Sequence, residues 1–476
     1  MPPGNRRVMI DVLQLIDGAW VPGTSGRKLT VVNPADGEPV THVTIASDED
    51  VTAAVAAART AAPGWAATAP AARAAALHAI ADAVEAATGE LAGIMSAEMG
   101  KPVADAAGSI AAGVGTLRQY AELGPTHRGR ALAGNDEAID LMAYAPRGVV
   151  AVITPWNDPV AVSCGLLGAA LVTGNTVVHK PSERTPATGW QLARLFAPHL
   201  PDGVLGLLNG DGSVGAALAA SPVDVVAQVG STATGRSIAA ACLRTGAKAL
   251  LENGGSDPLI VDADVDPAWA AQQAALGSFA NSGQICVAVE RIYAHRDVVE
   301  PFLDALAAEA DRWAGDIGPL VDRRLRETVD QQVQAAVQDG ARVLAGGEVP
   351  DGPGAYYPPT VLADCTDDMA VLREETFGPV APVVTVDSFD EGLRRAADSP
   401  YGLAATVLTG SMSHAQQAWR TLPAGTVKVN AVFGGAPGGA AHPRGGSGQG
   451  FGYGPELLDE MTVMKAVHIE APPAGW

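Results

Sequence analysis

The two residues best suited to carbonyl chemistry are Cys286 and Glu252, which are 34 positions apart (286 − 252). Cys286 ends the segment Phe279-Ala-Asn-Ser-Gly-Gln-Ile-Cys286, and Glu252 lies in Leu251-Glu-Asn-Gly-Gly255. A cysteine thiolate readily attacks a carbonyl carbon, and a carboxylate can remove a proton from a thiol or from water. The two residues therefore predict a nucleophile and its general base.

Each of these residues also has a structural interpretation. A lone cysteine is more often a small buried hydrophobic side chain than a nucleophile. Glu252 follows Lys248-Ala-Leu-Leu251 and would then be a helix or turn carboxylate. Asn157 after Trp156 would be a turn residue bonded to local backbone. The catalytic interpretation requires a fold that brings these side chains to one place.

The sequence from Gly148 onward predicts such a scaffold. Short apolar runs alternate with helix-length stretches, which is typical of a parallel sheet with crossover helices. These runs are 149–153, 176–178, 223–227 and 249–251, and a second block near Pro258 adds 259–261, 291–294, a helix over 298–310 and a strand over 380–386. Upstream, Ser47 to Gly100 predicts several helices, broken at Pro63 and Pro70. The expected fold class is α/β with more than one domain.

Composition excludes several kinds of partner. The chain has 476 residues, 47% of them hydrophobic, and a formal charge of −21, which disfavours nucleic acid and anionic membrane surfaces. Four cysteines without CxxC spacing indicate a reducing compartment, and Asp11 and Asp17 interrupt any signal peptide, so we expect a cytoplasmic protein. The uncharged stretch 159–178 predicts a buried helix, a turn and a strand rather than a membrane span.

Six further segments, taken with the Cys286 and Glu252 segments, resemble the aldehyde dehydrogenase superfamily along nearly the whole chain. They are Asn33-Pro-Ala-Asp-Gly37, Glu98-Met-Gly-Lys-Pro102, Pro155-Trp-Asn157, Lys180-Pro-Ser-Glu183, Gly230-Ser231 and Glu374-Glu-Thr-Phe-Gly-Pro379. The resemblance implies a Rossmann-like NAD-binding domain (1–127 and 147–253), a second α/β catalytic domain (254–430) and a small β oligomerisation flap (128–146 and 461–476). It also implies a homodimer or homotetramer.

The resemblance assigns catalytic roles to three residues. Cys286 adds to an aldehyde, and the Asn157 side-chain amide with the Cys286 backbone N–H stabilises the resulting oxyanion. A hydride then leaves for the nicotinamide, and Glu252 activates the water that hydrolyses the thioester. The implied product is a carboxylic acid.

The expected cofactor is NAD, held by residues from several segments. The candidates are Ile153, Thr154, Pro155, Trp156, Lys180, Ser182, Glu183, Gly230, Ser231, Glu375 and Phe377, with Gly210 and Gly212 of the motif Gly210-Asp-Gly-Ser-Val-Gly215. That motif fits G-x-G-x-x-G but lacks the acidic residue expected about 20 positions later. A carboxylate at Glu183 should repel the 2′-phosphate of NADP, so NAD is favoured over NADP.

The expected substrate tunnel departs from the family pattern. Its candidate residues are Asp158, Val162, Gly165, Ile285 and Val287. Asp158 stands in place of the usual aromatic residue, and small residues at 161, 162 and 165 predict a wider, less aromatic tunnel that disfavours a succinate-type substrate. We interpret Asp158 either as favouring an amino- or otherwise cationic aldehyde or as the cap of a helix starting at Pro159. The tunnel residues within 431–447 stay unassigned.

Three other functions compete with this interpretation. The first is a CoA-acylating semialdehyde dehydrogenase, although such members generally lack a Glu at position 252. The second is a catalytically silent binding or structural member. The third is a P-loop NTPase, since Gly230-Ser-Thr-Ala-Thr-Gly-Arg-Ser237 nearly fits the phosphate loop, but Arg236 replaces its lysine. The histidines show no ligand spacing, so no metal site is predicted.

Overall fold

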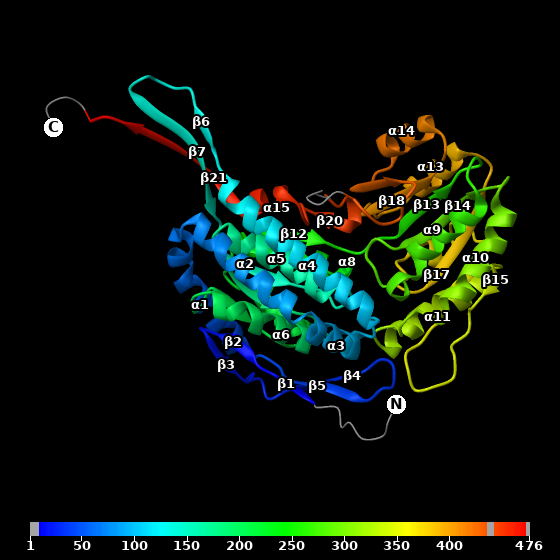
Figure 1. Ribbon diagram of the computed structural model, residues 1–476, viewed down its shortest axis with the longest axis horizontal. Coiled ribbons are helices and arrows are strands. Elements are labelled where there is room, and N and C mark those ends of the chain that lie inside the picture. The colour runs from blue at the N-terminus through cyan, green and yellow to red at the C-terminus, as the bar shows by residue number, and fades with distance from the viewer. Residues whose placement is uncertain (1–8, 436–441, 473–476) are drawn as a thin grey trace.

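Two α/β units lie side by side in the computed structural model, which describes residues 9–435 and 442–472 (Figure 1). Two three-stranded sheets are added to the first unit. One of them extends away from the body of the molecule together with the C-terminal strand. Some of the sequence interpretations lie outside the described residues. They concern residues 1–7, residues 436–441 of the unassigned tunnel segment 431–447, and residues 473–476 of the predicted flap.

The first unit is built on an eight-stranded sheet. From edge to edge its strands are β20 (Gly448–Gln449), β12 (Lys248–Glu252), β11 (Val225–Val229), β8 (Val149–Ile153), β9 (Thr176–Lys180), β10 (Leu205–Leu207), β2 (Gln14–Ile16) and β3 (Ala19–Val21). The five strands from β12 to β10 are parallel, and β8, β9 and β11 are buried along their whole length, as expected of a sheet covered on both faces. The chain leaves β8 toward β9 and returns to β11 on its other side, so the strand order reverses between β8 and β11. Ligands of open α/β sheets bind at such a reversal.

Helices cover this sheet. They are α1 (Asp48–Ala67), α2 (Pro70–Ala86), α3 (Thr88–Met99), α4 (Val103–Leu123), α5 (Pro159–Val172), α6 (Pro186–Phe196), α7 (Gly212–Ala220) and α8 (Thr232–Thr245), with short 3₁₀ turns at Gly124–Thr126 and Ala197–His199. The predicted break at Pro63 is wrong, because α1 continues through it. Buried residues on both sides of Pro63, among them Ala58 and Trp65, pack against the core, and this packing outweighs the hydrogen bond that proline removes.

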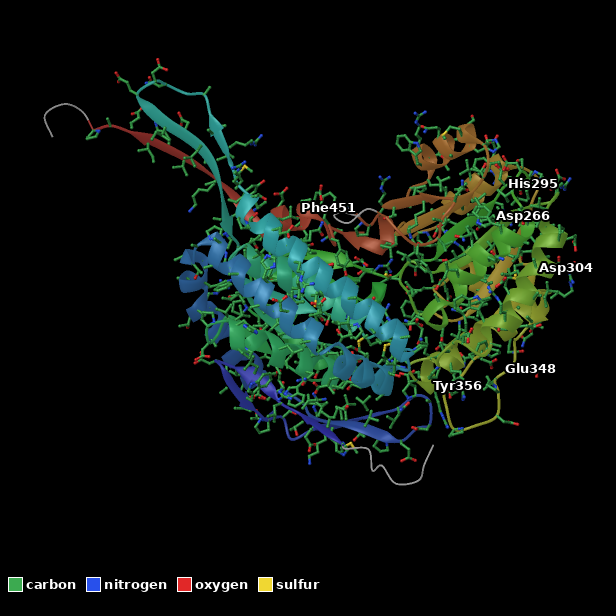
Figure 2. The ribbon with its side chains drawn as sticks, viewed as in Figure 1. Asp266, His295, Asp304, Glu348, Tyr356 and Phe451 are labelled. Atoms are coloured by element: carbon green, nitrogen blue, oxygen red, sulfur yellow. The ribbon has the colours of Figure 1, made fainter. Side chains whose placement is uncertain are left out.

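The second unit is built on a seven-stranded sheet. Its order is β15 (Arg342–Ala345), β16 (Thr360–Ala363), β17 (Val380–Val386), β14 (Val289–His295), β13 (Asp257–Val261), β18 (Ala404–Leu408) and β19 (Thr426–Val429). Its helices are α9 (Pro267–Phe279), α10 (Val299–Trp313), α11 (Arg323–Gln338), α12 (Ala370–Arg373), α13 (Phe389–Ala397) and α14 (Met412–Thr421). Asp266, His295 and Asp304 mark the end of this unit that faces away from the first (Figure 2). Its apolar core is separate from that of the first unit.

Two small sheets complete the structure. One consists of β1 (Ile10–Val12), β5 (Pro39–Thr44) and β4 (Lys28–Val32). The other consists of β21 (Thr462–Glu470), β7 (Ala138–Pro146) and β6 (Arg130–Leu132), with β21 antiparallel to β7 over nine residue pairs from Thr462↔Pro146 to Glu470↔Ala138. The helix α15 (Pro455–Glu460) precedes β21, and a 3₁₀ turn at Gly445–Ser447 precedes β20. This second sheet corresponds to the predicted flap.

Candidate active site

The two units are linked where the chain passes from β12 directly to β13. Glu252 is the last residue of β12 and Asp257 the first of β13, so four residues cross from one sheet to the other. Cys286 lies in the loop before β14, and β14 pairs with β13. The topology therefore brings the carboxylate and the thiol to the junction of the units, although they belong to different units.

Unusual backbone geometry shapes the loop that carries Cys286. Asn281, Ser282 and Gly283 form a 3₁₀ turn with the preceding Ala280, and all three have positive φ angles of 50°, 58° and 72°. At Gly283 a Cβ atom would lie 2.0 Å from the Gly378 carbonyl oxygen, so only glycine can adopt this conformation here. Side-chain hydrogen bonds hold the turn, including Ser282 Oγ to the Gly318 carbonyl at 2.7 Å. Strained loops of this kind are typical of functional sites.

The Cys286 thiol lies next to the Glu252 carboxylate. Cys286 Sγ is 3.6 Å from Glu252 Oε1 and donates a hydrogen bond to it. Burial raises the pKa of Glu252, and the hydrogen bond from Cys286 offsets part of this rise. Burial and the nearby carboxylates of Glu252, Asp257 and Glu375 hold the pKa of Cys286 well above its ordinary value. The thiol is therefore protonated at rest, with a base in position to accept its proton.

Asn157 is fixed close to this pair. Its side-chain Nδ2 donates to the Gln284 carbonyl at 3.0 Å, and its own carbonyl accepts from Asn281 Nδ2 at 3.4 Å. The side chain is buried, and it follows the carboxyl end of β8. An amide nitrogen carries two hydrogens, so one N–H holds the nucleophile loop and the other is available to a reacting oxygen.

A cleft of about 830 Å³ runs from this point along the carboxyl ends of the parallel strands of the first unit. All the predicted cofactor residues except Gly210 line it: Ile153, Thr154, Pro155, Trp156, Lys180, Ser182, Glu183, Gly212, Gly230, Ser231, Glu375 and Phe377. Asn157 and Cys286 line it as well. Gly210 does not line this cleft, and a Cβ at this position would lie 2.5 Å from Val214 Cγ2 of α7.

One end of the cleft suits a ribose with vicinal hydroxyls. Lys180 Nζ is 3.5 Å from Glu183 Oε2, and the lysine side chain is almost completely buried. Burial lowers the pKa of Lys180, whereas the Glu183 charge offsets part of this effect. An ammonium donor and a carboxylate acceptor side by side can bind two neighbouring hydroxyls.

The other end is lined by Glu375 and two aromatic rings. Glu375 Oε1 accepts the Gly255 backbone N–H at 3.0 Å. Buried Glu290, which the sequence analysis missed, accepts the N–H groups of Thr376 and Phe377 at 3.0 and 2.8 Å and fixes this loop. The ring of Phe377 meets that of Trp156 edge to face, with centroids 5.5 Å apart.

Arg184 is a second residue that the sequence analysis missed. Its guanidinium lies over the Trp156 ring, 5.2 Å from the centroid, and pairs with Asp322 at 2.7 Å. Asp322 is the N-cap of α11 in the second unit. Arg184 therefore links the two units across the cleft.

These features fit a dinucleotide such as NAD. The cleft volume lies within the range of small-molecule sites, and the cleft occupies the point where the strand order reverses. Ser231 caps α8, and its hydroxyl accepts the Thr234 N–H, so the positive end of the helix faces the cleft. Hydroxyl-binding groups at both ends and apolar rings near Cys286 match the two riboses and the nicotinamide.

Glu375 gives the cofactor site a predicted pH dependence. Burial raises its pKa to about 7, so its carboxylate is present above this pH and is lost as the pH falls through it. Because the protonated acid is a weaker acceptor for ribose hydroxyls, the KM for NAD should rise about tenfold between pH 8 and pH 6. Steady-state kinetics at saturating aldehyde measure this change.

Two variants make this prediction specific. Glu375→Gln should raise the KM for NAD at every pH and remove its pH dependence, whereas Glu374→Gln, at an exposed neighbouring position, should behave as the wild type. A wild-type KM that does not change with pH, or an equal pH dependence in Glu375→Gln, would contradict the role of Glu375.

The predicted tunnel residues come from two segments, the loop that carries Cys286 and the start of α5. Ile285 and Val287 flank the nucleophile and are half-buried, and Val162 lies on the buried surface of α5. The expectation of a wider, less aromatic tunnel is wrong at Gly165. The ring of Tyr453, which the sequence analysis did not single out, fills the space that a larger side chain would take.

Asp158 does not cap α5 with its side chain, although it occupies the N-cap position. Its Oδ1 accepts a hydrogen bond from Ser109 Oγ and lies 3.7 Å from Lys101 Nζ. Lys101 is buried and belongs to the segment Glu98 to Pro102. Its ammonium offsets much of the Asp158 charge.

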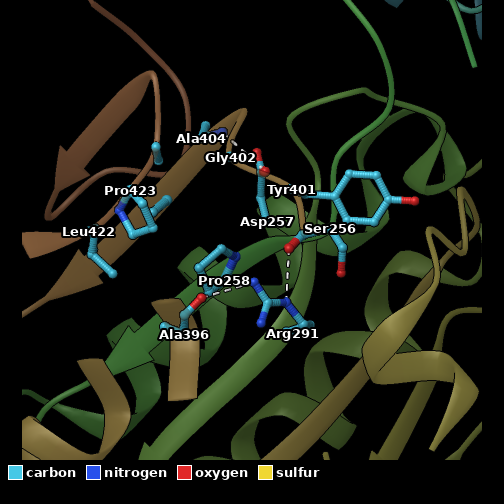
Figure 3. Close-up of a pocket in the computed structure, with 12 residues that line it drawn as sticks. Ser256, Asp257, Pro258, Arg291, Ala396, Tyr401, Gly402, Ala404, Leu422 and Pro423 are labelled. Carbon is cyan, nitrogen blue, oxygen red and sulfur yellow. Dashed lines mark hydrogen bonds between the residues drawn. The ribbon is translucent and has the colours of Figure 1, made fainter. Parts of the chain in front are cut away.

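The pocket in Figure 3 is too small to hold a substrate or a cofactor. Its volume is about 10 Å³, which is room for one water at most. Arg291 donates to the carbonyls of Ser256 and Ala396, and Asp257 Oδ1 accepts the Ala404 N–H at 3.0 Å. Burial raises the pKa of Asp257 to about 8. These hydrogen bonds of Arg291 and Asp257 connect residues of β13, β14 and β18.

The P-loop alternative finds little support in the structure. In the segment 230–237 the helix α8 already begins at Thr232, so no phosphate loop is formed. Within 9–435 and 442–472, no cluster of His, Cys, Asp and Glu could hold a metal ion. Over the same ranges, no helix is long and apolar enough to cross a membrane.

Comparison with known proteins agrees with this geometry. Residues 20–467 match the model of the aldehyde dehydrogenase family. Similar solved structures include an NAD-dependent aldehyde dehydrogenase from Sinorhizobium meliloti (34% identity, TM-score 0.94, covering 99% of this chain and 97% of that one). A second similar structure is lactaldehyde dehydrogenase from Escherichia coli (32% identity, TM-score 0.94, covering 98% of this chain and 100% of that one). A third is an indole-3-acetaldehyde dehydrogenase in complex with NAD+ (34% identity, TM-score 0.94, covering 98% of this chain and 97% of that one). The chain therefore belongs to the aldehyde dehydrogenase family, as an NAD-dependent oxidoreductase that acts on aldehydes.

Proposed function

We propose that the enzyme converts its aldehyde into a carboxylic acid by covalent catalysis at Cys286, with water as the final acceptor of the acyl group. The observation that supports this proposal is the 3.6 Å contact between Cys286 Sγ and Glu252 Oε1 at the inner end of the cofactor cleft. Asn157 is fixed beside the same loop. Nucleophile, base and oxyanion donor thus surround one position for a carbonyl group.

The first half of the reaction forms the thioester. Glu252 takes the thiol proton, the sulfur bonds to the carbonyl carbon, and the carbonyl electron pair moves to the oxygen. The Asn157 amide and the Cys286 N–H donate to that oxyanion. NAD, when bound, supplies the hydride acceptor. Re-formation of the C=O bond as the hydride leaves yields an acyl group on Cys286.

The second half releases the acid. Glu252 first releases the thiol proton to solvent. It then takes a proton from water, the hydroxide adds to the thioester carbon, and the C–S bond breaks with its electron pair returning to sulfur, which recovers a proton from Glu252. Burial raises the pKa of Glu252, which makes its carboxylate a stronger base than an exposed one. The base favours hydrolysis over transfer to CoA.

The sequence interpretation of a cationic aldehyde receives only partial support. Asp158 lies at the expected wall, but the Lys101 ammonium at 3.7 Å offsets its charge. The names of the similar enzymes do not decide the question, because lactaldehyde and indole-3-acetaldehyde differ in size and polarity. We therefore propose an uncharged substrate.

The choice of cofactor has a direct test. Because the Glu183 carboxylate lines the cleft and repels a 2′-phosphate, kcat/KM for NAD should exceed that for NADP by at least about tenfold. Glu183→Gln should narrow this ratio, and Glu300→Gln, on the exposed surface of α10, should leave it unchanged. Reduced-nicotinamide absorbance with a panel of aldehydes gives both values. A preference for NADP would overturn the assignment to Glu183, and no absorbance with any aldehyde would overturn the proposed reaction.

We also propose that the flap sheet mediates a homodimer or homotetramer in the cytoplasm. Its strands expose large apolar side chains, which are Leu132, Ile139, Val463, Met464 and Ile469. Exposed apolar side chains on a projecting sheet suit a contact with a second copy of the chain. All four cysteines are free, which suits a reducing compartment.

A further inference from the structure

Tyr453 occupies the space above α5 that Gly165 leaves open. A Cβ at Gly165 would lie 2.6 Å from Tyr453 Cε1 and 3.3 Å from Cδ1, so the ring packs directly on the glycine backbone. Tyr453 belongs to the segment between β20 and α15, whose Phe451 is labelled in Figure 2. The predicted tunnel therefore has an aromatic wall, supplied from the C-terminal part of the chain.

The segment around Tyr453 also touches the catalytic base. A Cβ at Gly452 would lie 2.6 Å from Glu252 Oε2, the carboxylate oxygen that does not bond Cys286. Burial and the negative charges of Glu252 and Asp158 raise the pKa of Tyr453 well above its ordinary value. The phenol therefore keeps its proton at neutral pH and can donate a hydrogen bond.

The position of Tyr453 is fixed, but its hydroxyl is unused. Tyr120 Oη donates to the Gly454 carbonyl at 3.4 Å, and the Phe451 N–H donates to Glu460 Oε1 at 3.3 Å. No residue in the described part of the chain hydrogen-bonds the Tyr453 hydroxyl, and the side chain is half-buried. A polar group held in a confined site without a protein partner is suited to a ligand.

We propose that Tyr453 is a specificity-determining residue, whose hydroxyl donates a hydrogen bond to a hydroxyl group on the chain of the aldehyde substrate. This inference rests on the proposed function. A substrate hydroxyl accepts from Tyr453 and can donate to Asp158 Oδ2, because the hydrogen bond from Ser109 and the 3.7 Å approach of Lys101 Nζ are both to Oδ1. Glu252 and Asp158 disfavour an anionic substituent, and Lys101 disfavours a cationic one. The preferred class is short hydroxyaldehydes, because the ring limits the space.

Matched pairs of aldehydes test the proposal. The first pair is 2-hydroxypropanal and 2-methylpropanal, and the second is 4-hydroxybutanal and pentanal. In each pair the second aldehyde carries a methyl group where the first carries a hydroxyl, so the two are nearly equal in size. The wild type should favour the hydroxylated member of at least one pair by tenfold or more in kcat/KM. Tyr453→Phe, which keeps the ring, should remove most of this preference. It should do so by lowering kcat/KM for the hydroxylated aldehyde while leaving kcat/KM for its methyl analogue unchanged. The exposed control Tyr356→Phe should leave the ratios unchanged.

The outcomes separate this proposal from the proposed function. If neither pair shows a preference in the wild type, or if Tyr453→Phe lowers both members equally, the role of Tyr453 is wrong while aldehyde oxidation stands. If no aldehyde reduces NAD, the proposed function itself fails. Tyr453→Ala provides a second readout, because an opened tunnel should raise kcat/KM for pentanal relative to 2-methylpropanal.

Discussion

Replacing Cys286 by serine is expected to lower kcat for aldehyde oxidation by at least about 10³-fold. A serine hydroxyl has the shape of the thiol but is a far weaker acid, and the Glu252 carboxylate is too weak a base to activate it. Because the cleft lining is otherwise unchanged, the affinity for NAD should stay within about twofold of the wild type. NADH absorbance in the steady state and titration with NAD measure the two effects.

Cys242→Ser is the matched control for this experiment. Cys242 is buried on α8, away from the Glu252 carboxylate that Cys286 contacts, so its replacement should leave kcat within a fewfold of the wild type. An enzyme that keeps a tenth or more of its activity without the Cys286 sulfur would contradict its role as nucleophile.

Replacing Glu252 by glutamine is expected to stop the reaction after the first half. The amide keeps the shape of the carboxylate but cannot take a proton from water, so hydrolysis should slow by about 10²- to 10⁴-fold. Rapid mixing with aldehyde and NAD should therefore show a burst of NADH that approaches one equivalent per site. The burst should be slower than in the wild type, because the thiol loses its proton to solvent rather than to Glu252. It still forms, because the missing carboxylate no longer raises the pKa of Cys286. Steady-state turnover should then be almost absent.

An added nucleophile distinguishes this block from a damaged site. Hydroxylamine attacks thioesters without a base and should restore turnover to Glu252→Gln. Glu374→Gln, at an exposed position near the cleft, should retain full turnover. Steady-state turnover of Glu252→Gln that stays within a fewfold of the wild type would place Glu252 outside the hydrolytic step. Failure of both the burst and the rescue would show that Cys286 does not react without Glu252.

Much of the fold follows from local sequence patterns. The buried runs at 149–153 and 380–386 are strands β8 and β17 with the predicted bounds, because apolar runs between turn signals leave few alternatives. The uncharged stretch 159–178 divides into α5, a turn and β9 as expected. Pro63 shows the limit of such patterns, because contacts distant in sequence keep α1 continuous there.

The site was predictable where a motif carries its own geometry. Residues after the ends of β8, β9 and β11 had to gather at one edge of the sheet, and they line the cleft there. Tyr453, Arg184 and the Lys101–Asp158 pair depend instead on which distant segments meet. A glycine at 165 suggests open space in the sequence, and only the fold shows which ring fills it.

The most direct test of the account locates the acyl group itself. Glu252→Gln is mixed with aldehyde and NAD, quenched in acid after the NADH burst, and mapped by peptide mass spectrometry. We expect one acyl group on the peptide that carries Cys286, formed only when NAD is present. NADH formation with Cys286 unmodified, or with the acyl group on another residue, would contradict it.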